Sequence, residues 1–337
     1  MESVINFVLL TLLVVIAIEI ARLKDLFAVV MLIGIYGLVS ASFFVVMDAV
    51  DVAFTEASVG AGISTLLMLV VISLTQRSEH PVRHRPFGAL LVVMLTGGML
   101  IYGTLDMPYV GAGDAPIHIH IAPRYLNDSM QEVGVANVVT AVLASYRAFD
   151  TFGELVVIFT AGVGVSALLM TVGRRGDKKP AVAINDSMHK QQLILRIVSK
   201  MMLPFIMLFA FYVQFHGDYG PGGGFQAGVI FAAAIILYTL LFGLTSARRV
   251  INQTVSQLVA AFGVLLYGSV GLVSLLNGGN FLDYNVLASN PISGQHLGIL
   301  LIELGVGITV ASVMITIFFN FAGRKELQKS TSENKGT

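Results

Sequence analysis

Apolar residues follow one another along this chain in long blocks, which short polar stretches interrupt. Each block approaches the roughly 20 residues that a helix needs to cross about 30 Å of hydrocarbon. The blocks predict nine spans, at residues 4–21, 25–47, 52–75, 87–103, 150–172, 193–215, 225–246, 254–276 and 297–319. The pattern therefore predicts an all-α, polytopic transmembrane protein.

Residues 133–149 are only moderately apolar, so the charges between the blocks decide whether they form a tenth span. The positive-inside bias favours the cytoplasmic side for basic clusters. Nine spans, with the N-terminus outside and the C-terminus cytoplasmic, put every cluster there. A tenth span at 133–149 would place every basic cluster from Arg174 onward on the outer side. Residues 133–149 are therefore predicted to form a short helix at the outer face or one that dips into the protein. The clusters are Arg22 and Lys24; Arg77, Arg83 and Arg85; Arg174, Arg175, Lys178 and Lys179; Arg248 and Arg249; Arg324 and Lys325.

Composition agrees with a bilayer location and narrows the chemistry. The chain is 56% hydrophobic and 12% charged, with a mean hydropathy of +0.84, far from the soluble norm. Its net charge is zero, so no nucleic-acid partner is expected. The absence of cysteine excludes thiolate metal sites and Cys-ligated iron–sulfur clusters. Glu2 stands where a signal peptide would be basic, which predicts that the first block is retained.

One stretch, HGDYGPGGGFQAG at His216–Gly228, cannot continue a helix. Proline removes a donor, and consecutive glycines lose the most backbone entropy on ordering. Two interpretations remain open: a tight surface turn, or broken backbone that is buried in protein or lines a wet cavity. No Lys-Ser/Thr follows the glycines, so a phosphate-binding loop is not expected.

Ionisable residues in or near hydrocarbon are the candidates for ion chemistry. A charge at the bilayer centre costs about 2.5 kcal/mol or more, so such residues are usually functional or paired. A lone carboxyl group at low dielectric is also a suitable proton carrier. Glu19 is explained by a local ion pair with Arg22. The remaining candidates are Glu56, Asp150, Glu154 and Glu303, with Arg147 and His216 close by.

Each candidate has a structural alternative. Glu56 lies about one turn inside the third span and could be an interfacial carboxylate; the small residues 57–62 after it allow close helix contact or a local break. Asp150 and Glu154, spaced i and i+4 behind Arg147, could simply stabilise a helix N-terminus. Glu303 lies nearly two turns into the last span, where no Lys or Arg can neutralise it; it is either paired from elsewhere or protonated, and a functional role is favoured.

Two histidines stand apart in the long outer segment at residues 104–132. His118 and His120 alternate, so they would share one face of a strand. Two such side chains can ligate a metal, but no third ligand is evident nearby. A solvated loop is therefore favoured, and no metal site is predicted.

Several of these motifs resemble one family. QLILRIVSKMMLPFIMLFAFYVQFHGDYGPGGGFQAG, at 192–228, is similar to the start of the B-type subunit of Mrp-type multisubunit sodium/proton antiporters, which shows an RG-H-x-x-PGGGFQGG pattern. Residues 298–307 resemble the last span of that B-type subunit, including Glu303. Ala227 departs from a usual glycine, whereas the matching loop residues are Pro221, Gly222, Gly223, Gly224, Phe225 and Gln226.

Two further motifs resemble the tail of the A-type subunit of the same antiporters. YRAFDTFGE at 146–154 is similar to the RGFDTLGE motif near the C-terminus of that subunit, which is also found as a separate small subunit in membrane-bound hydrogenases. DVAFTEA at 51–57 resembles the DVALTE motif of the companion segment. The five spans before residue 176 are also similar to the complex I subunit called J.

The resemblance implies a fusion: residues 1–80 and 81–175 as two A-like parts, a cytoplasmic linker at 176–192, a B-like part at 193–323, and a tail at 324–337. It implies ion-translocating roles for Glu56, Asp150 and Glu154 and, more weakly, for His216 and Glu303. Sodium ions and protons would be transported, with no cofactor, across a bacterial or archaeal cytoplasmic membrane.

The expected partners are the other subunits of an Mrp-type antiporter, because no Lys stands in the centre of any span, as it does in the large antiporter-like subunits. The chain itself is expected to be a transporter subunit and not an enzyme. Two alternatives stay open. It could be the ion-translocating subunit of a complex I-like hydrogenase or oxidoreductase, or a scaffold whose acids are merely paired.

Overall fold

The computed structural model describes residues 2–79, 86–109, 111–173 and 193–333. Within these ranges, nine helices are long and apolar enough to cross a membrane, and no strand is present beyond an isolated bridge between Asp25 and Ser78. The prediction of an all-α protein with nine spans is confirmed. The spans are α1 (Glu2–Arg22), α2 (Leu26–Val46), α3 (Val50–Glu56) continued by η1 (Ala57–Ser64) and α4 (Thr65–Ile72), α5 (Pro86–Thr104), α10 (Ala148–Gly173), α12 (Leu193–His216), α13 (Gly224–Phe242), α15 (Gln253–Leu276) and α16 (Pro291–Glu333).

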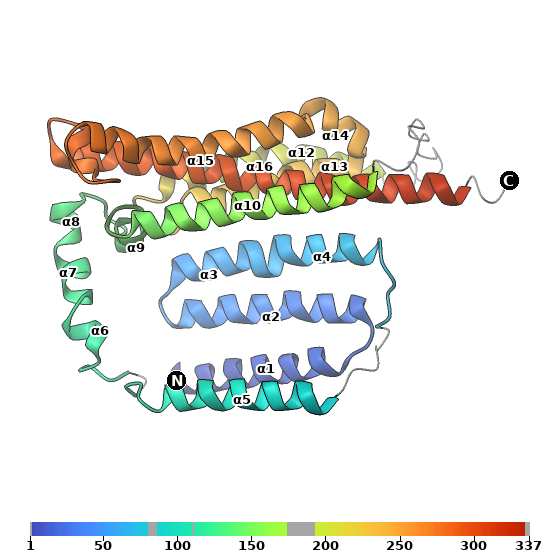
Figure 1. Ribbon diagram of the computed structural model, residues 1–337, viewed down its shortest axis with the longest axis horizontal. Helices are drawn as coiled ribbons and strands as arrows, with labels where there is room; N and C mark the ends of the chain where they lie inside the picture. Colours follow the sequence, from blue (N-terminus) through green and yellow to red (C-terminus); the bar gives the residue numbers. More distant parts are fainter. Residues whose placement is uncertain (1, 80–85, 110, 174–192, 334–337) are drawn as a thin grey trace.

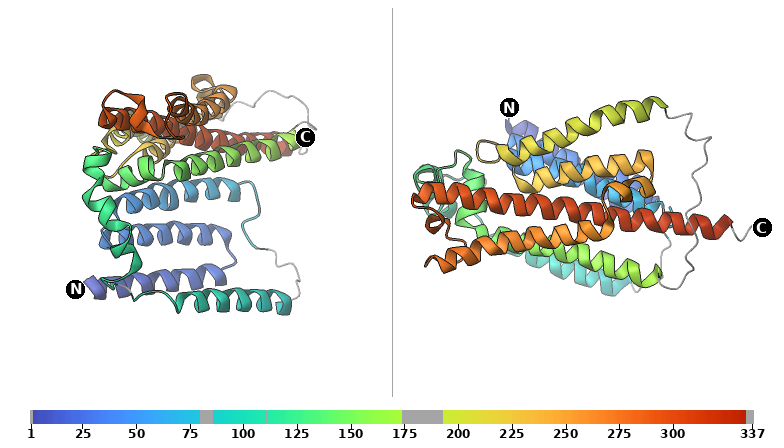
Figure 2. Two further views of the ribbon diagram at one scale, coloured as in Figure 1. Left: turned by 60° about the vertical axis from the view of Figure 1, so that its left-hand side comes forward. Right: turned by 90° about the horizontal axis from the view of Figure 1, so that it is seen from above.

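Five of the spans form a bundle, with α16 at its centre. α10, α12, α13 and α15 surround it (Figures 1 and 2), and 67% of the apolar window of α16 is buried. Hydroxyl side chains join α15 to α16 in the interior: Ser256 Oγ donates to the Ser312 carbonyl and Thr309 Oγ1 to the Ala260 carbonyl. Hydrogen bonds of this kind hold membrane helices together where no hydrophobic driving force acts between them.

The remaining spans extend from the bundle as a row. The broken helix α3–η1–α4 lies against it, α2 packs on that helix, and α1 packs on α2 (Figure 1). α5 lies on the far side of the row from the bundle, and none of its spanning residues is buried. Much of the apolar surface of this row is therefore left uncovered by the chain itself.

The helix ends sort into two groups. One end of the molecule, the loop end, carries the Gly-rich loop, the segments that connect α5 to α10, and η3 (Tyr284–Leu287) (Figure 1). The other end carries α14 (Leu244–Val250) and the described basic clusters, at Arg22, Lys24, Arg77, Arg248, Arg249 and Arg324. Clustering at one end is what the topology prediction requires; which end faces the cytoplasm stays a prediction. Arg83, Arg85, Arg174, Arg175, Lys178, Lys179 and the linker at 176–192 lie outside the described residues.

Residues 133–147 form no helix long enough to cross a membrane, in agreement with the prediction. They form two short helical pieces at the loop end, α9 (Val138–Thr140) and η2 (Ala141–Tyr146), before α10 begins. Three other short helices precede them: α6 (Pro116–Ile119), α7 (Ala122–Asn127) and α8 (Ser129–Glu132). His118 and His120 lie in and just after a short helical turn, whereas a solvated loop was favoured. Pro116 opens the helical turn α6 instead, since its fixed φ and missing N–H suit a first helical position. No group of three metal-binding side chains occurs among the residues described.

Candidate functional site at the junction of three segments

The Gly-rich loop turns into the protein rather than away from it. The N–H of Gly223 donates to the carbonyl of Val213, in the last turn of α12. Gly223 has φ +113°, a left-handed conformation that favours glycine, and α13 begins at the next residue. A Cβ on Gly224 would lie 2.1 Å from the backbone oxygen of Glu303, so only glycine lets α13 start against α16. Of the two interpretations, the structure supports backbone that lines a cavity.

That cavity, here called the junction cavity, has a volume of about 280 Å³. A cavity needs only about 10–15 Å³ of this kind of volume to admit one water molecule, so this space has room for several. Residues from three segments of the chain, 1–80, 81–175 and 193–323, line it. They are Asp51 and Thr55 from α3, Glu154 from α10, and Glu303 from α16, with loop residues 222–226. Three carboxyl groups therefore face one space, and no Lys or Arg is among the described residues that line it. Such a space attracts cations.

Hydrogen bonds connect α3 to the B-like part across this cavity. Gln226 donates from Nε2 to Thr55 Oγ1 at 2.8 Å, and that hydroxyl donates to the carbonyl of Asp51 at 3.0 Å. Asp51 Oδ1 in turn accepts long hydrogen bonds, each of 3.4 Å, from the N–H of Gly222 and from Asn137 Nδ2. Asp51 is thus a member of the site, although the sequence analysis included it only within the DVAFTEA motif and not among the candidate ion-binding residues.

Glu303 has a different environment. Its carboxylate lies beside the loop, 3.2 and 3.1 Å from where Cβ atoms on Gly217 and Gly223 would stand. No described residue forms a hydrogen bond or an ion pair with this carboxylate, and its side chain is partly exposed into the cavity. The group is therefore free to bind a proton or a cation.

Glu56 does not join the junction cavity. It ends α3, and the next residues form the π-helix η1, as the small residues there suggested. The Glu56 carboxylate folds back over Gly60 and toward Gly37 of α2. It therefore lies on the other side of the third span from Thr55, although π-helical turns of this kind are frequent at functional sites.

Asp150 and Arg147 also lie outside the lining of the cavity. Arg147 pairs with Asp150 at 2.5 Å, and both side chains are more than half exposed. Glu154 is exposed on the surface of this chain as well, at the rim of the cavity, and Glu56 is partly exposed. The expectation that these carboxyl groups are buried is therefore not confirmed. Glu19 forms the expected ion pair with Arg22, at 3.6 Å.

His216 and Pro221 belong to the loop stretch but do not line the cavity. The His216 ring stacks on Tyr212, with centroids 4.8 Å apart. Asp218, two residues later, faces His296 of α16 at 3.7 Å. Pro221 is exposed and contributes to a shallow hollow beside α2 and α3. Of the predicted loop residues, Gly222, Gly223, Gly224, Phe225 and Gln226 line the junction cavity.

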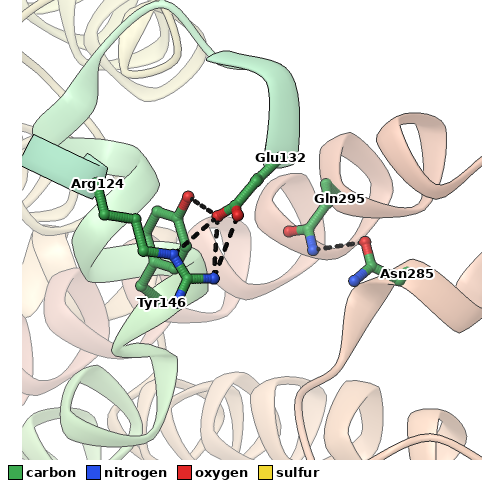
Figure 3. Close-up of polar contacts among 5 residues, drawn as sticks. All are labelled: Arg124, Glu132, Tyr146, Asn285 and Gln295. Carbon is green, nitrogen blue, oxygen red and sulfur yellow. Dashed lines mark hydrogen bonds and ion pairs between the residues drawn. The ribbon is translucent and has the colours of Figure 1, made fainter. Parts of the chain in front are cut away.

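A second polar cluster, which sequence reasoning missed, joins the loop-end helices (Figure 3). Arg124 of α7 binds Glu132 of α8 at 3.2 Å, and the Tyr146 hydroxyl donates to the same carboxylate. The Tyr146 hydroxyl and, less strongly, Arg124 hold the pKa of Glu132 below its usual range. Burial and the nearby Glu132 raise the pKa of Tyr146 to about 12, so its hydroxyl stays a donor at physiological pH. Beside this cluster, Gln295 donates to Asn285.

Family models match consecutive parts of the chain. One, described as a domain related to the MnhB subunit of the Na+/H+ antiporter, matches residues 194–316. Two others, described as the D-type and E-type subunits of MBH, match residues 11–77 and 91–183 respectively. The MnhB-related match contains the Gly-rich loop and Glu303, and the other two contain Asp51 and Glu154.

Curated relatives carry the same parts in different combinations. The chain is 32% identical over 139 residues to the putative antiporter subunit mnhB2 of Staphylococcus aureus (strain Newman), which covers 40% of this chain and 98% of the relative. It is 26% identical over 324 residues to the probable K+/H+ antiporter A/B subunit of Rhizobium meliloti (strain 1021), covering 88% of this chain and 32% of the relative. The chain thus spans about a third of the length of that A/B relative.

Solved structures resemble the fold as well. A chain of the Mrp complex from Dietzia sp. superposes with a TM-score of 0.72 at 27% identity, covering 94% of this chain and 34% of that one. A chain of the membrane-bound sulfane sulfur reductase, an archaeal respiratory membrane complex, gives a TM-score of 0.52 at 27% identity. This second match covers 71% of the present chain and 98% of the other.

Fold and site together define a polytopic helical membrane protein in which three segments enclose a carboxylate-lined cavity. Because it covers an MnhB-type subunit almost completely at 32% identity, the chain belongs to the MnhB family of antiporter subunits. Its other two parts, which match the D-type and E-type MBH subunits, are consistent with a fusion of C-terminal segments of an A-type subunit to a B-type subunit.

Proposed function

We propose that this chain is a membrane subunit of a multisubunit antiporter that exchanges a monovalent cation for protons. The observation that carries the proposal is the junction cavity, in which Asp51, Glu154 and Glu303 face one space without a basic side chain among its described lining. Three acids that no basic side chain of the described lining neutralises suit the passage of cations better than a purely structural contact. The names of the relatives agree with this function, since they are antiporter subunits.

Chemically, the cavity offers the ligands that a hard cation prefers. Sodium and potassium bind carboxylate, hydroxyl and carbonyl oxygens, and the cavity presents Asp51, Thr55, the Gln226 amide and the loop backbone. Glu303 and Glu154 would bind a proton or a cation in turn. Competition between the two ions for the same oxygens is the elementary requirement for exchange.

The rest of the assembly is also part of the proposal. Residues 1–80 and 81–175 would serve as A-like parts and 193–323 as the B-like part, joined by a cytoplasmic linker at 176–192. Other antiporter subunits would cover the exposed faces of α1, α2 and α5, and the Arg147–Asp150 pair and Glu56 would lie on routes into them. No cofactor is required, and the complex would reside in a bacterial or archaeal cytoplasmic membrane.

One specific finding favours a second function. Residues 11–77 and 91–183 match MBH subunits, and the fold matches a chain of a respiratory membrane complex. In this alternative, the same cavity would move ions in a complex whose redox chemistry occurs in soluble partner subunits. Purification of the native complex distinguishes the two, because iron–sulfur subunits would copurify only in the second case.

Vesicles that carry the whole complex test the proposed function. Cation-dependent dissipation of an imposed pH gradient should fall at least tenfold in Glu154→Gln, at an unchanged amount of assembled complex. Glu19→Gln is the matched control, since Glu19 sits in a local ion pair away from the cavity and should exchange normally. Unchanged exchange in Glu154→Gln would instead support a scaffold that only seals helices between active subunits.

A further inference from the structure

Asn137 lies where all three segments of the chain meet. It precedes α9 in the second segment, and its side-chain amide nitrogen donates to the carbonyls of Gly217 at 3.2 Å and Gly220 at 3.0 Å in the third. The same nitrogen reaches Asp51 Oδ1 of the first segment, at 3.4 Å. One amide group thus contacts both the Gly-rich loop and a carboxylate of the junction cavity.

The other polar groups of Asn137 are engaged as well. Its backbone N–H donates to the carbonyl of Asp218 at 3.0 Å, which gives the loop a further attachment to Asn137. Its Oδ1 accepts from the N–H of Val139 and so caps α9. Thr140, one turn on, adds a hydrogen bond of 2.7 Å to the carbonyl of Gly217. The loop is therefore held by side chains from another segment.

We propose that Asn137 is a positioning residue that holds the Gly-rich loop and Asp51 in register across the junction cavity, so that Asp51 and Glu303 face the same ion. This inference rests on the proposed function. A loop this rich in glycine has no conformational preference of its own, so its shape depends on outside contacts. Released from Asn137, the Gly217 and Gly223 backbone would shift away from the Glu303 carboxylate, against which it now lies. The Gly222 N–H would leave Asp51 for the same reason.

The two duties of Asn137, capping α9 and holding the loop, can be separated by substitution. Asn137→Ser keeps an oxygen that can cap the helix but has no amide donor for the loop carbonyls and Asp51. Asn137→Ala removes both. If positioning is the function, the serine and alanine variants should show the same defect. If capping alone matters, the serine variant should behave as wild type.

The measurement is the cation concentration for half-maximal exchange in vesicles that contain the full complex, at equal assembly. We expect Asn137→Ser to raise that concentration roughly fivefold to tenfold, which is the effect of losing about one net hydrogen bond of ordinary strength. Asp51→Asn should itself raise that concentration, and in this background Asn137→Ser should add little more, because the carboxylate to be positioned is then gone.

Three results would overturn the inference: an unchanged half-maximal concentration in Asn137→Ser, a rise of the same size in the Asp51→Asn background, or loss of assembly in the serine variant, which would show a structural requirement only. Failure of the proposed function looks different. In that case Asp51→Asn and Glu303→Gln would themselves leave exchange intact, whatever Asn137 does.

Discussion

Residue by residue, the site depends on how closely backbone can approach a carboxyl-bearing helix. Gly224 lies directly on the Glu303 backbone, and Gly217 and Gly223 leave room for the Glu303 carboxylate. Any side chain on these residues would push α13 or the loop away from α16. The glycines are thus needed because they leave space for the Glu303 backbone and carboxylate. Gly223 is also needed for its left-handed turn.

Gly224→Ala tests this contact. Its Cβ would lie 2.1 Å from the Glu303 oxygen and 3.0 Å from the Gly307 nitrogen, both backbone atoms that cannot step aside. We expect a loss of about 1–3 kcal/mol from overpacking, seen as a lower thermal midpoint of the detergent-solubilised complex. Gly164→Ala in α10 is the control, since nothing lies within 4 Å of its position and alanine favours a helix. Equal midpoints for both variants would contradict the account.

The sequence could point to Glu154, Glu303 and Gln226, because acids in an apolar run and a polar side chain after glycines are local signals. It could not point to Asn137 or Thr55. Their functional contacts join residues separated by 80 to 171 positions, and each looks locally like an ordinary cap or helix residue. Asp51 was visible in the sequence, but only the folded chain turns it toward the loop.

Among the elements, the loop-end helices depend most on polar contacts. α7 and α8 are short and have few buried residues, and the cluster of Arg124, Glu132 and Tyr146 ties them to η2 (Figure 3). Short helices are marginal in isolation, so such contacts decide whether they stay docked. The Glu132 carboxylate accepts hydrogen bonds from both Arg124 and Tyr146 and is the centre of the cluster.

This cluster predicts a pH dependence. The pKa of Glu132 is lower in the folded protein than its usual value of about 4.3, so its contribution to stability is complete above that value. The contribution is lost as the pH falls through the folded pKa. Amide hydrogen exchange in residues 122–132, corrected for intrinsic rates, should therefore quicken between pH 6 and pH 3.

Glu132→Gln provides the control. Without the charged acceptor, residues 122–132 should exchange quickly at both ends of that pH range, whereas α16 should keep its slow exchange in wild type and variant. A wild-type segment whose protection is independent of pH would show that the cluster does not hold these helices.

Elements were predictable where the signal is local. The nine spans follow from hydropathy, and the break after Glu56 was suggested by its run of small residues. The helical turn at His118 was not predicted, because a solvated loop was favoured there, although Pro116 is a signal for a helix start. The cluster around Glu132 could not be foreseen, since its members come from separate short helices.

Over the whole molecule, the chain is a bundle with a row of helices attached to it. Hydropathy predicts the spans but not which of them pack together. The position of α5 away from the bundle could therefore not be predicted from the sequence. The distribution of basic residues was more informative, because the described clusters all lie at one end.

The orientation prediction is testable because the chain has no cysteine of its own. Asn280→Cys places a thiol at the loop end and Ser78→Cys places one at the basic end; both positions are exposed. In intact cells, a membrane-impermeant maleimide should label Asn280→Cys at once and Ser78→Cys only after permeabilisation. The reverse pattern would invert the topology.

The central claim is that carboxyl groups from different segments serve one ion path through the junction cavity. The most direct test compares Glu154→Gln, Glu303→Gln and the double variant for cation-dependent dissipation of a pH gradient, at equal assembly. On a shared path, the rate of cation-dependent dissipation should fall at least tenfold in each single variant. In the double variant, it should fall no further than in the more impaired single variant. Normal exchange in either single variant, or losses that multiply in the double variant, would contradict a common path.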